Sequence, residues 1–284
     1  VSSLIYSPNA DRLFVGTAEG VLCVFSNLGR GEKPILDTLY EDPMRRPIFG
    51  IGLSGDGTTF LVMTNWEIYF VRSSSDGGNF VPTGFSQRVE QERVTSFDLS
   101  AGNKYLAVSG IHSTILYELS FADKGSMAER LRVQHPDITM TDVAIKVNQT
   151  GDNLWIALGG EDGRLWISSA ISTSMNYPVI GIGDPVFHLF PGAHESTITA
   201  LEFNPVLPQL FSASIFGEAR LWNLNRLNNV DDHIFLRNSG KSISAAIYNN
   251  ENELIIHEVI YGKRILTNVR AIRAELDILL EKIQ

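Results

Sequence analysis

The chain has 284 residues, of which 44% are apolar and 19% charged, so it can bury a full core and does not have the composition of a disordered protein. Its 32 acidic and 23 basic residues leave a formal net charge of -9, which opposes binding to nucleic acid or to an anionic membrane surface. No apolar run approaches the ~20 residues that cross a bilayer, so no membrane insertion is expected. The single cysteine, Cys23, favours a reducing, intracellular compartment, cytoplasmic or nuclear.

A polar turn of four residues recurs along the chain between runs rich in strand-forming residues. The copies begin at residues 7, 54, 100, 148, 204 and 249, in steps of 47, 46, 48, 56 and 45 residues. This spacing is close to the ~40–45 residues of a four-stranded propeller blade. The six turns are Ser7-Pro8-Asn9-Ala10, Ser54-Gly55-Asp56-Gly57, Ser100-Ala101-Gly102-Asn103, Asn148-Gln149-Thr150-Gly151, Asn204-Pro205-Val206-Leu207 and Asn249-Asn250-Glu251-Asn252. The sequence therefore predicts six repeats of one unit.

The runs on the two sides of each turn differ in pattern. Before the turn, apolar residues alternate with small ones, as in residues 49–53, which indicates a strand with one buried face. After the turn the runs are almost continuously apolar, as in residues 60–63 and 105–108, which is expected of central strands covered on both faces. A tight turn with a glycine such as Gly163 follows in most copies and leads into a third strand.

The fifth copy carries the most specific residues. Its segment FSASIFGEARLWNL, residues 211–224, places Trp222 near the end of a third strand, and His194 precedes the first strand of the same copy. In these features the sequence resembles the WD-repeat family. The resemblance covers about residues 2–266 and implies an all-β fold, a WD-repeat-like β-propeller of six or seven blades, with a propeller domain over residues 1–266.

The resemblance also implies a buried network that joins a histidine, a serine or threonine, an aspartate and a tryptophan. Copy five offers His194, Ser212 or Ser214, and Trp222, whereas Phe216 occupies the position of the aspartate. No copy carries all four residues. We therefore expect a divergent propeller that is held mainly by apolar packing between blades.

The family resemblance further implies that the outermost strand of the last blade comes from the other end of the chain, which removes exposed sheet edges. The sequence starts directly in a first strand, and no further strand is recognisable after the third strand of copy six. We expect the ring to be closed by residues outside this sequence, a seventh blade included, or by a strand from a partner.

Residues 267–284 change from strand to helix periodicity. Their apolar residues are spaced 3, 4, 3 and 4 apart, which predicts an amphipathic C-terminal α-helix with one apolar stripe. The stripe consists of Val269, Ile272, Leu276, Leu279 and Ile283. It fits two alternatives, packing on the propeller or an adjoining domain, or contact with a partner chain or a helical solenoid. In the second alternative Ile272, Leu276 and Leu279 bind the partner.

Motifs of catalysis and cofactor binding are missing from the sequence. The six histidines are not spaced for a zinc site, and neither a nucleophile elbow nor a phosphate-binding loop is present. The pair Arg45-Arg46 lacks the flanking Phe and Gly of the motif in phosphoinositide-binding propellers. We predict no enzymatic activity, no metal and no cofactor.

Large side chains stand in four of the turns between second and third strands, where small or polar residues are usual. Such a ring either packs onto a neighbouring blade or is offered to a partner, and aromatic residues are favoured interface anchors. Two arginines that precede first strands are expected on the same face, where they can pair with acidic groups of a peptide. The candidate partner-binding residues of this face are Arg46, Trp66, Arg93, His112, Phe216 and Tyr261.

The repeats, the missing catalytic motifs and the apolar stripe favour a non-catalytic scaffold or adaptor that binds protein subunits or peptides in a larger intracellular complex. Two alternatives stay open, the propeller domain of a trafficking coat, tether or pore subunit, and a reader of peptides or histone tails. A calcium-dependent propeller hydrolase is disfavoured, because its site needs acidic or amide side chains on the inner strands. Those positions are expected to be chiefly apolar or small.

Overall fold

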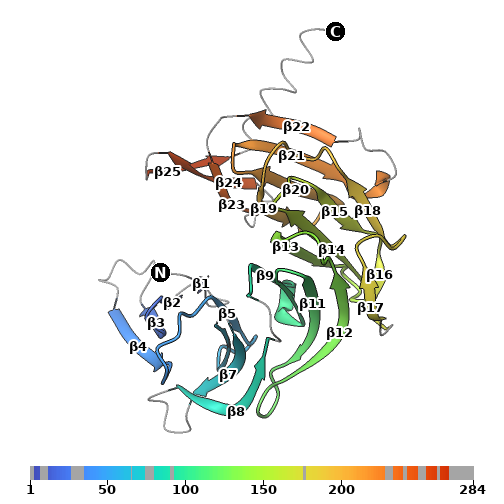
Figure 1. Ribbon diagram of the computed structural model, residues 1–284. Helices are drawn as coiled ribbons and strands as arrows, with labels where there is room; N and C mark the ends of the chain where they lie inside the picture. Colours follow the sequence, from blue (N-terminus) through green and yellow to red (C-terminus); the bar gives the residue numbers. More distant parts are fainter. Residues whose placement is uncertain are drawn as a thin grey trace.

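In the described residues, the computed structural model shows six β-sheets that follow one another in chain order along an arc, with the first strand of each sheet on the inside (Figure 1). The six sheets confirm the six predicted repeats, and we call them blades 1 to 6. The structure describes residues 3–6, 12–26, 35–64, 66–73, 80–89, 93–174, 177–227, 233–238, 242–248, 254–260 and 263–268.

Blades 1 to 3 each contain four consecutive strands paired with their neighbours in chain order. Blade 1 consists of β1 (Ser3–Tyr6), β2 (Leu13–Gly16), β3 (Val21–Ser26) and β4 (Ile35–Glu41). Blade 2 consists of β5 (Gly50–Leu53), β6 (Thr59–Met63), β7 (Glu67–Ser73) and β8 (Phe80–Arg88). Blade 3 consists of β9 (Ser96–Leu99), β10 (Tyr105–Ser109), β11 (Ser113–Ser120) and β12 (Ser126–Gln134), with the 3₁₀-helix η1 (Ala101–Asn103) between its first two strands.

Blades 4 to 6 depart from this plan at two places, an insertion in blade 4 and blade 6, of which the described residues form three strands. Blade 4 consists of β13 (Met140–Val147), β14 (Asn153–Gly160), β15 (Leu165–Ser168) and β18 (Phe187–Phe190), with β16 (Ile171–Ser172) and β17 (Tyr177–Gly181) inserted before the last strand. Blade 5 consists of β19 (Ile198–Phe203), β20 (Gln209–Ser214), β21 (Glu218–Asn223) and β22 (His233–Asn238), with the 3₁₀-helix η2 (Leu224–Arg226) after β21. Blade 6 consists of β23 (Ser242–Tyr248), β24 (Leu254–Ile260) and β25 (Lys263–Asn268).

The insertion in blade 4 explains the long fourth step of the repeat. β16 pairs with β14, and β17 adds a parallel fifth strand to the outer edge of blade 3, next to β12. The half-buried Ile180 on β17 packs against the core that blades 3 and 4 share. The inserted residues therefore connect two blades and extend one sheet instead of forming a loose loop.

The polar turns between first and second strands are closed by their own side chains. In blade 2, Ser54 Oγ donates to Asp56 Oδ1 at 2.6 Å and accepts the backbone N–H of Thr59 at 2.9 Å. Gly57 has a φ of 72°, a conformation that costs glycine little. This is why serine, aspartate and glycine recur at these positions.

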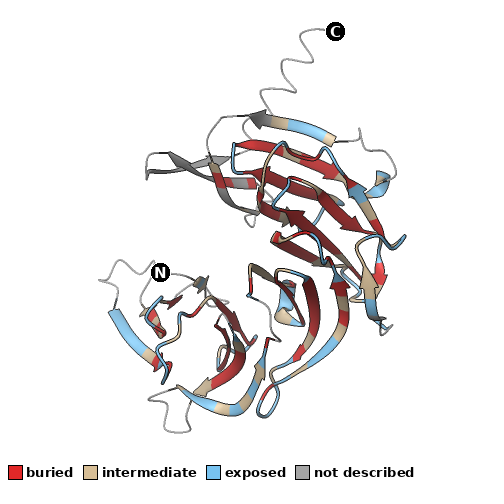
Figure 2. Ribbon diagram, viewed as in Figure 1, coloured by how far each residue is buried: buried red, intermediate tan, exposed pale blue. Residues whose placement is uncertain are grey.

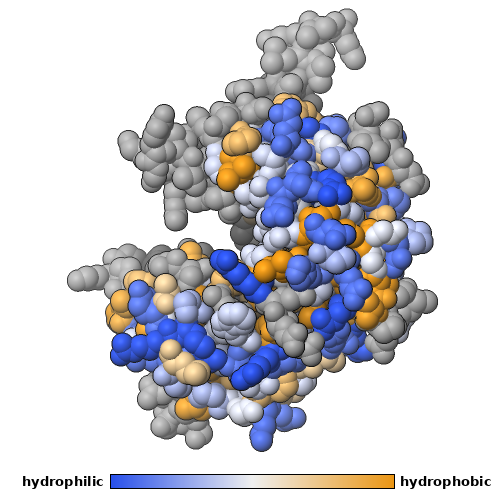
Figure 3. Space-filling view, in the orientation of Figure 1, coloured by the Kyte–Doolittle hydropathy of each residue, from blue (hydrophilic) through white to orange (hydrophobic). Residues whose placement is uncertain are grey.

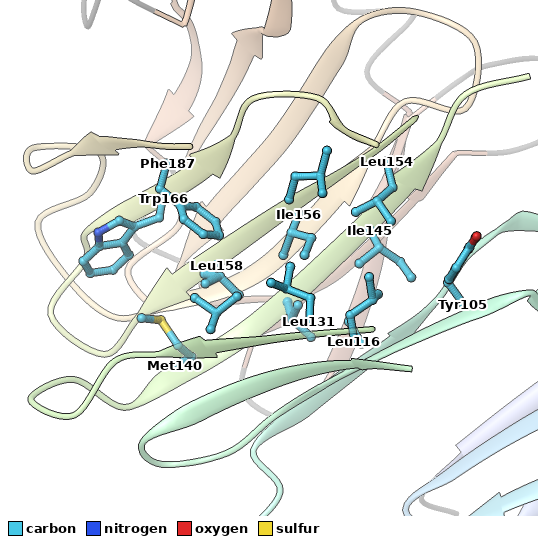
Figure 4. Packing of buried hydrophobic residues seen from close by; sticks show 14 of the residues in the cluster. Tyr105, Leu116, Leu131, Met140, Ile145, Leu154, Ile156, Leu158, Trp166 and Phe187 are labelled. Atoms are coloured by element: carbon cyan, nitrogen blue, oxygen red, sulfur yellow. The ribbon is translucent and has the colours of Figure 1, made fainter. Parts of the chain in front are cut away.

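Apolar packing between blades forms the core, as the sequence predicts. The central strands β6 and β10 are buried along their whole length, and Figure 2 shows buried residues concentrated in the middle of the sheets. One cluster joins blades 3 and 4, where Tyr105, Leu116 and Leu131 face Ile145 and Ile156 (Figure 4). Each large side chain buried in this way contributes about 1.5–3 kcal/mol.

The two ends of the arc are formed by blade 1 and blade 6, which Figure 1 shows apart from each other. In blade 6 the described residues form three strands, and β25 has a partner on one side. β25 runs to Asn268, two residues beyond the predicted end of the propeller domain at residue 266. Residues 269–284 lie outside the described part of the chain, and the helix, with Ile272, Leu276 and Leu279, stays a prediction.

Candidate interaction surface on the turn face

The turns between second and third strands occupy equivalent positions on one face of the blades, which we call the turn face. In four blades a backbone carbonyl of this turn accepts an N–H from the segment that follows the outer strand of the same blade. The pairs are Asp42 N to Gly20 O at 2.7 Å, Val89 N to Trp66 O at 3.0 Å, His135 N to His112 O at 2.8 Å and His194 N to Gly163 O at 3.1 Å. Trp66 and His112 thus hold the same place in neighbouring blades, on turns fixed by backbone hydrogen bonds.

Trp66 projects from the turn of blade 2. Its side chain is 57% exposed, so the alternative in which the ring packs onto a neighbouring blade is wrong for this residue. The turn itself is closed, because Thr64 N donates to Glu67 O at 2.9 Å and Glu67 N donates to Thr64 Oγ1 at 3.1 Å. A large exposed ring therefore stands on a turn whose flanking residues are hydrogen-bonded to each other.

Arg46, a predicted partner-binding residue, is half-buried and uses its guanidinium for ion pairs inside the protein. Its guanidinium donates to both carboxylate oxygens of Asp42, at 2.7 Å for Nη2 to Oδ2, and to Glu67 Oε2. Tyr69 Oη donates to Asp42 Oδ2 at 2.8 Å. Burial disfavours the ionised form of Asp42, but these hydrogen bonds outweigh it and hold the pKa of Asp42 below its usual value. Arg46 therefore ties blade 1 to the turn that carries Trp66.

The other two polar candidates, Arg93 and His112, are both exposed. His112 Nδ1 lies 3.1 Å from the carbonyl oxygen of Pro136, so the ring leans on the segment after β12. Arg93 stands just before β9. Both side chains are accessible on the turn face.

Phe216 is the second exposed ring, at 63%, and Ile215 beside it is 43% exposed. Their turn is closed by Gly217 N donating to Ser214 O at 3.0 Å. Packing onto a neighbouring blade is therefore wrong for Phe216 as well. Phe216 belongs to blade 5 and Trp66 to blade 2, with blades 3 and 4 between them (Figure 1). These two rings do not converge into an aromatic cage.

Apolar side chains do not form one broad patch on the side of the molecule that Figure 3 shows, where small apolar groups alternate with polar ones. Tyr261, the remaining ring among the candidates, lies outside the described residues.

The hydrogen-bond network expected in copy five is present and lies buried inside blade 5. Ser212 Oγ accepts from Trp222 Nε1 at 2.8 Å and lies 2.7 Å from His194 Nε2. Trp222 is 3% exposed, and its ring centroid lies 4.8 Å from that of Phe190. Of the two predicted serines, Ser212 is the network residue, whereas the buried hydroxyl of Ser214 makes no hydrogen bond.

Glu218, which the sequence analysis missed, lies where an acidic partner of the histidine was expected. Its Oε2 is 3.6 Å from His194 Nδ1 and accepts the backbone N–H of Glu195 at 2.8 Å. Burial, with the positive charge of Arg220 and an electrostatic interaction with His233, lowers the pKa of His194 to about 3. Because His194 is then neutral, Glu218 acts on the backbone and does not form an ion pair with it.

Three inner strands, β9, β13 and β19, each carry one acidic residue among positions that are chiefly apolar or small. Asp98 Oδ2 accepts Ile145 N of the next blade at 2.7 Å, and Asp142 Oδ2 accepts Leu201 N of the following blade at 2.7 Å. Burial raises the pKa of Asp98 to about 7, that of Asp142 to about 6 and that of Glu202 to about 8, and the other carboxylates add to the effect on Asp98 and Glu202. The two aspartates thus join neighbouring blades.

These carboxyl groups do not make a metal centre. Within the described ranges, no three histidine, cysteine, aspartate or glutamate side chains are grouped so that they could hold a metal ion. The same segments contain no helix with the length and apolar character needed to span a bilayer.

Comparison with solved structures shows the fold to be a WD-repeat-type β-propeller. Sqt1 of Chaetomium thermophilum superposes with a TM-score of 0.64 at 16% identity, over 90% of this chain and 66% of that protein. Sqt1 bound to the N-terminus of ribosomal protein L10 gives 0.64 at 15% identity, over 90% and 69% of the two chains. A chain of the mitotic checkpoint complex gives 0.59 at 15% identity, over 94% and 76%. No protein-family profile and no curated protein sequence matches the chain.

Proposed function

We propose that the protein is a non-catalytic, intracellular interaction scaffold that binds a protein partner on its turn face, with Trp66 as the main anchor. The observation that carries the proposal is the 57% exposure of Trp66 on a turn that is fixed on both sides. Tryptophan is among the residues most enriched at interface hot spots, where its truncation costs 2 kcal/mol or more.

The ion pairs around the turn support the proposal because they fix the position of the turn that carries Trp66 before a partner binds. Arg46 connects Glu67, the residue after Trp66, to the buried Asp42 of blade 1. A ring that is positioned before binding loses less conformational entropy on association. Trp66 is therefore a contact point that is already in position before the partner binds.

The structural neighbours support the same class of function. Sqt1 has been solved with the N-terminus of ribosomal protein L10, and another neighbour is part of the mitotic checkpoint complex. Both are propellers in protein assemblies.

The test compares the proteins captured from an extract of the expressing cells by the full chain and by two variants. Trp66→Ser removes the proposed anchor, and Val81→Ser is the matched control, because Val81 is 48% exposed on the outer strand β8. We expect at least one stoichiometric partner to be lost with Trp66→Ser and kept with Val81→Ser, while both variants melt like the wild type. If the native protein is a free monomer in extract by size exclusion with light scattering, the scaffold function is excluded.

A further inference from the structure

A groove lies between blades 4 and 5 on the face opposite the turn face, where the turns between first and second strands meet. It encloses about 240 Å³. This is less than the roughly 300–1,000 Å³ of typical small-molecule sites, so it suits one or two side chains of a peptide. Its lining is Lys146, Val147, Asn148, Gln149, Trp155, Pro205, Val206, Pro208, Leu224 and Asn225.

Lys146 gives the groove a positive charge. Its Nζ donates to the backbone carbonyls of Asn204 at 2.5 Å and Leu207 at 2.6 Å, which fix the position of the ammonium group. An ammonium group has three N–H donors, so one remains beyond these two carbonyls. Burial lowers the pKa of Lys146, and no carboxylate of the described residues counters this effect. A ligand carboxylate would supply the missing counter-charge.

The remaining wall of the groove is largely apolar. Val206 is 66% exposed at the rim, whereas Trp155 and Leu224 are half-buried and pack against the core of blades 4 and 5. Exposed apolar side chains beside a half-buried cation form a surface that favours an apolar group next to an acid.

Both turns that border the groove are held in shape by asparagines. Asn204 Oδ1 accepts the N–H groups of Val206 at 2.9 Å and Leu207 at 2.7 Å. Asn148 Oδ1 accepts the N–H of Asn153 at 3.1 Å. The groove is therefore preformed, which lowers the entropy cost of binding.

We propose that this groove binds a protein segment in which an aspartate or glutamate stands next to a large apolar residue. The acid pairs with Lys146, and the apolar side chain lies on Trp155 beside Val206. The net charge of -9 does not prevent this, because charges more than about 8 Å away are largely screened at physiological salt. The site is separate from Trp66 and does not depend on the turn-face proposal.

A random twelve-residue peptide library, selected on the immobilised full chain, tests the proposal. We expect the enriched sequences to contain an acid beside an apolar residue. The best of them, made as a free peptide, is titrated against the wild type, Lys146→Met and Val206→Asp. Lys146→Met keeps the aliphatic stem and removes the charge, and Val206→Asp changes an exposed rim position that folding does not need. Each should weaken binding at least tenfold.

The matched controls are the same peptide with Asn or Gln in place of its acid, and the Trp66→Ser variant of the protein. The amide peptide should bind at least tenfold more weakly, whereas Trp66→Ser should leave affinity unchanged. Selection without an acidic motif, or equal affinity for wild type and Val206→Asp, would overturn the proposal. A peptide whose binding depends on Trp66 and not on Lys146 would instead support the turn-face site.

Discussion

Trp222→Ala should destabilise the fold, whereas Trp66→Ala should weaken association with a partner and leave the fold nearly unchanged. Trp222 is 3% exposed, and Trp66 is 57% exposed. Removing a buried tryptophan costs about 3–5 kcal/mol, because the apolar contacts are lost and a cavity remains. The hydrogen bond from Trp222 Nε1 to Ser212 adds about 1 kcal/mol. An exposed substitution away from such features changes stability by about 0.5 kcal/mol or less.

Thermal melting followed by circular dichroism converts these energies into a measurable difference. At roughly 2–4 °C per kcal/mol for a domain of about this size, the total of about 4–6 kcal/mol means that Trp222→Ala should lower the Tm by roughly 8–24 °C, and Trp66→Ala should lower it by less than about 2 °C. Trp222→Phe is the control for the polar part, since it keeps most of the packing and removes the N–H donor. A larger loss for Trp66→Ala than for Trp222→Ala would refute the assignment of both residues.

Three further predictions concern the pH dependence and the joints between blades. The pKa of Glu202 is raised to about 8, so the folded state binds more protons than the unfolded state and stability should fall as pH rises from 6.5 to 8.5. Glu202→Gln should make the dependence of the Tm on pH less steep in thermal melts. Arg46→Met leaves the buried carboxylate of Asp42 without its cation and should lower the free energy of unfolding in urea by roughly 2–3 kcal/mol. The control Arg45→Met, at an exposed position, should lower it by less than about 0.5 kcal/mol, and equal losses would argue against a joint between blades 1 and 2. Gly163→Ala should destabilise the protein far more than Gly102→Ala by the same measurement. Both glycines have a positive φ, 81° and 78°, but an added Cβ would collide with backbone atoms at position 163 and would meet open space at position 102.

The sequence by itself determined the six repeats, the central strands and the burial of Trp222. These features depend on local patterns, because a turn of serine, aspartate and glycine and an apolar run are specified within about fifteen residues. The Ser212 network was implied by the resemblance of copy five to the WD-repeat family, which rests on His194 and Trp222. The choice between Ser212 and Ser214 was not implied, because both serines have inward positions on β20 and sequence does not reveal the hydroxyl geometry.

The tertiary structure decided everything that depends on contacts between blades. Arg46 is adjacent in sequence to an exposed arginine, and one of its two carboxylate partners, Glu67 at the start of β7, lies 21 residues away in the chain. The addition of β17 to blade 3 and the groove at Lys146 likewise join residues that lie about 45 to 60 positions apart in the chain. Local periodicity specifies which face of a strand is buried. It does not specify which residues of a neighbouring blade that face contacts, because these contacts depend on how the sheets twist and pack.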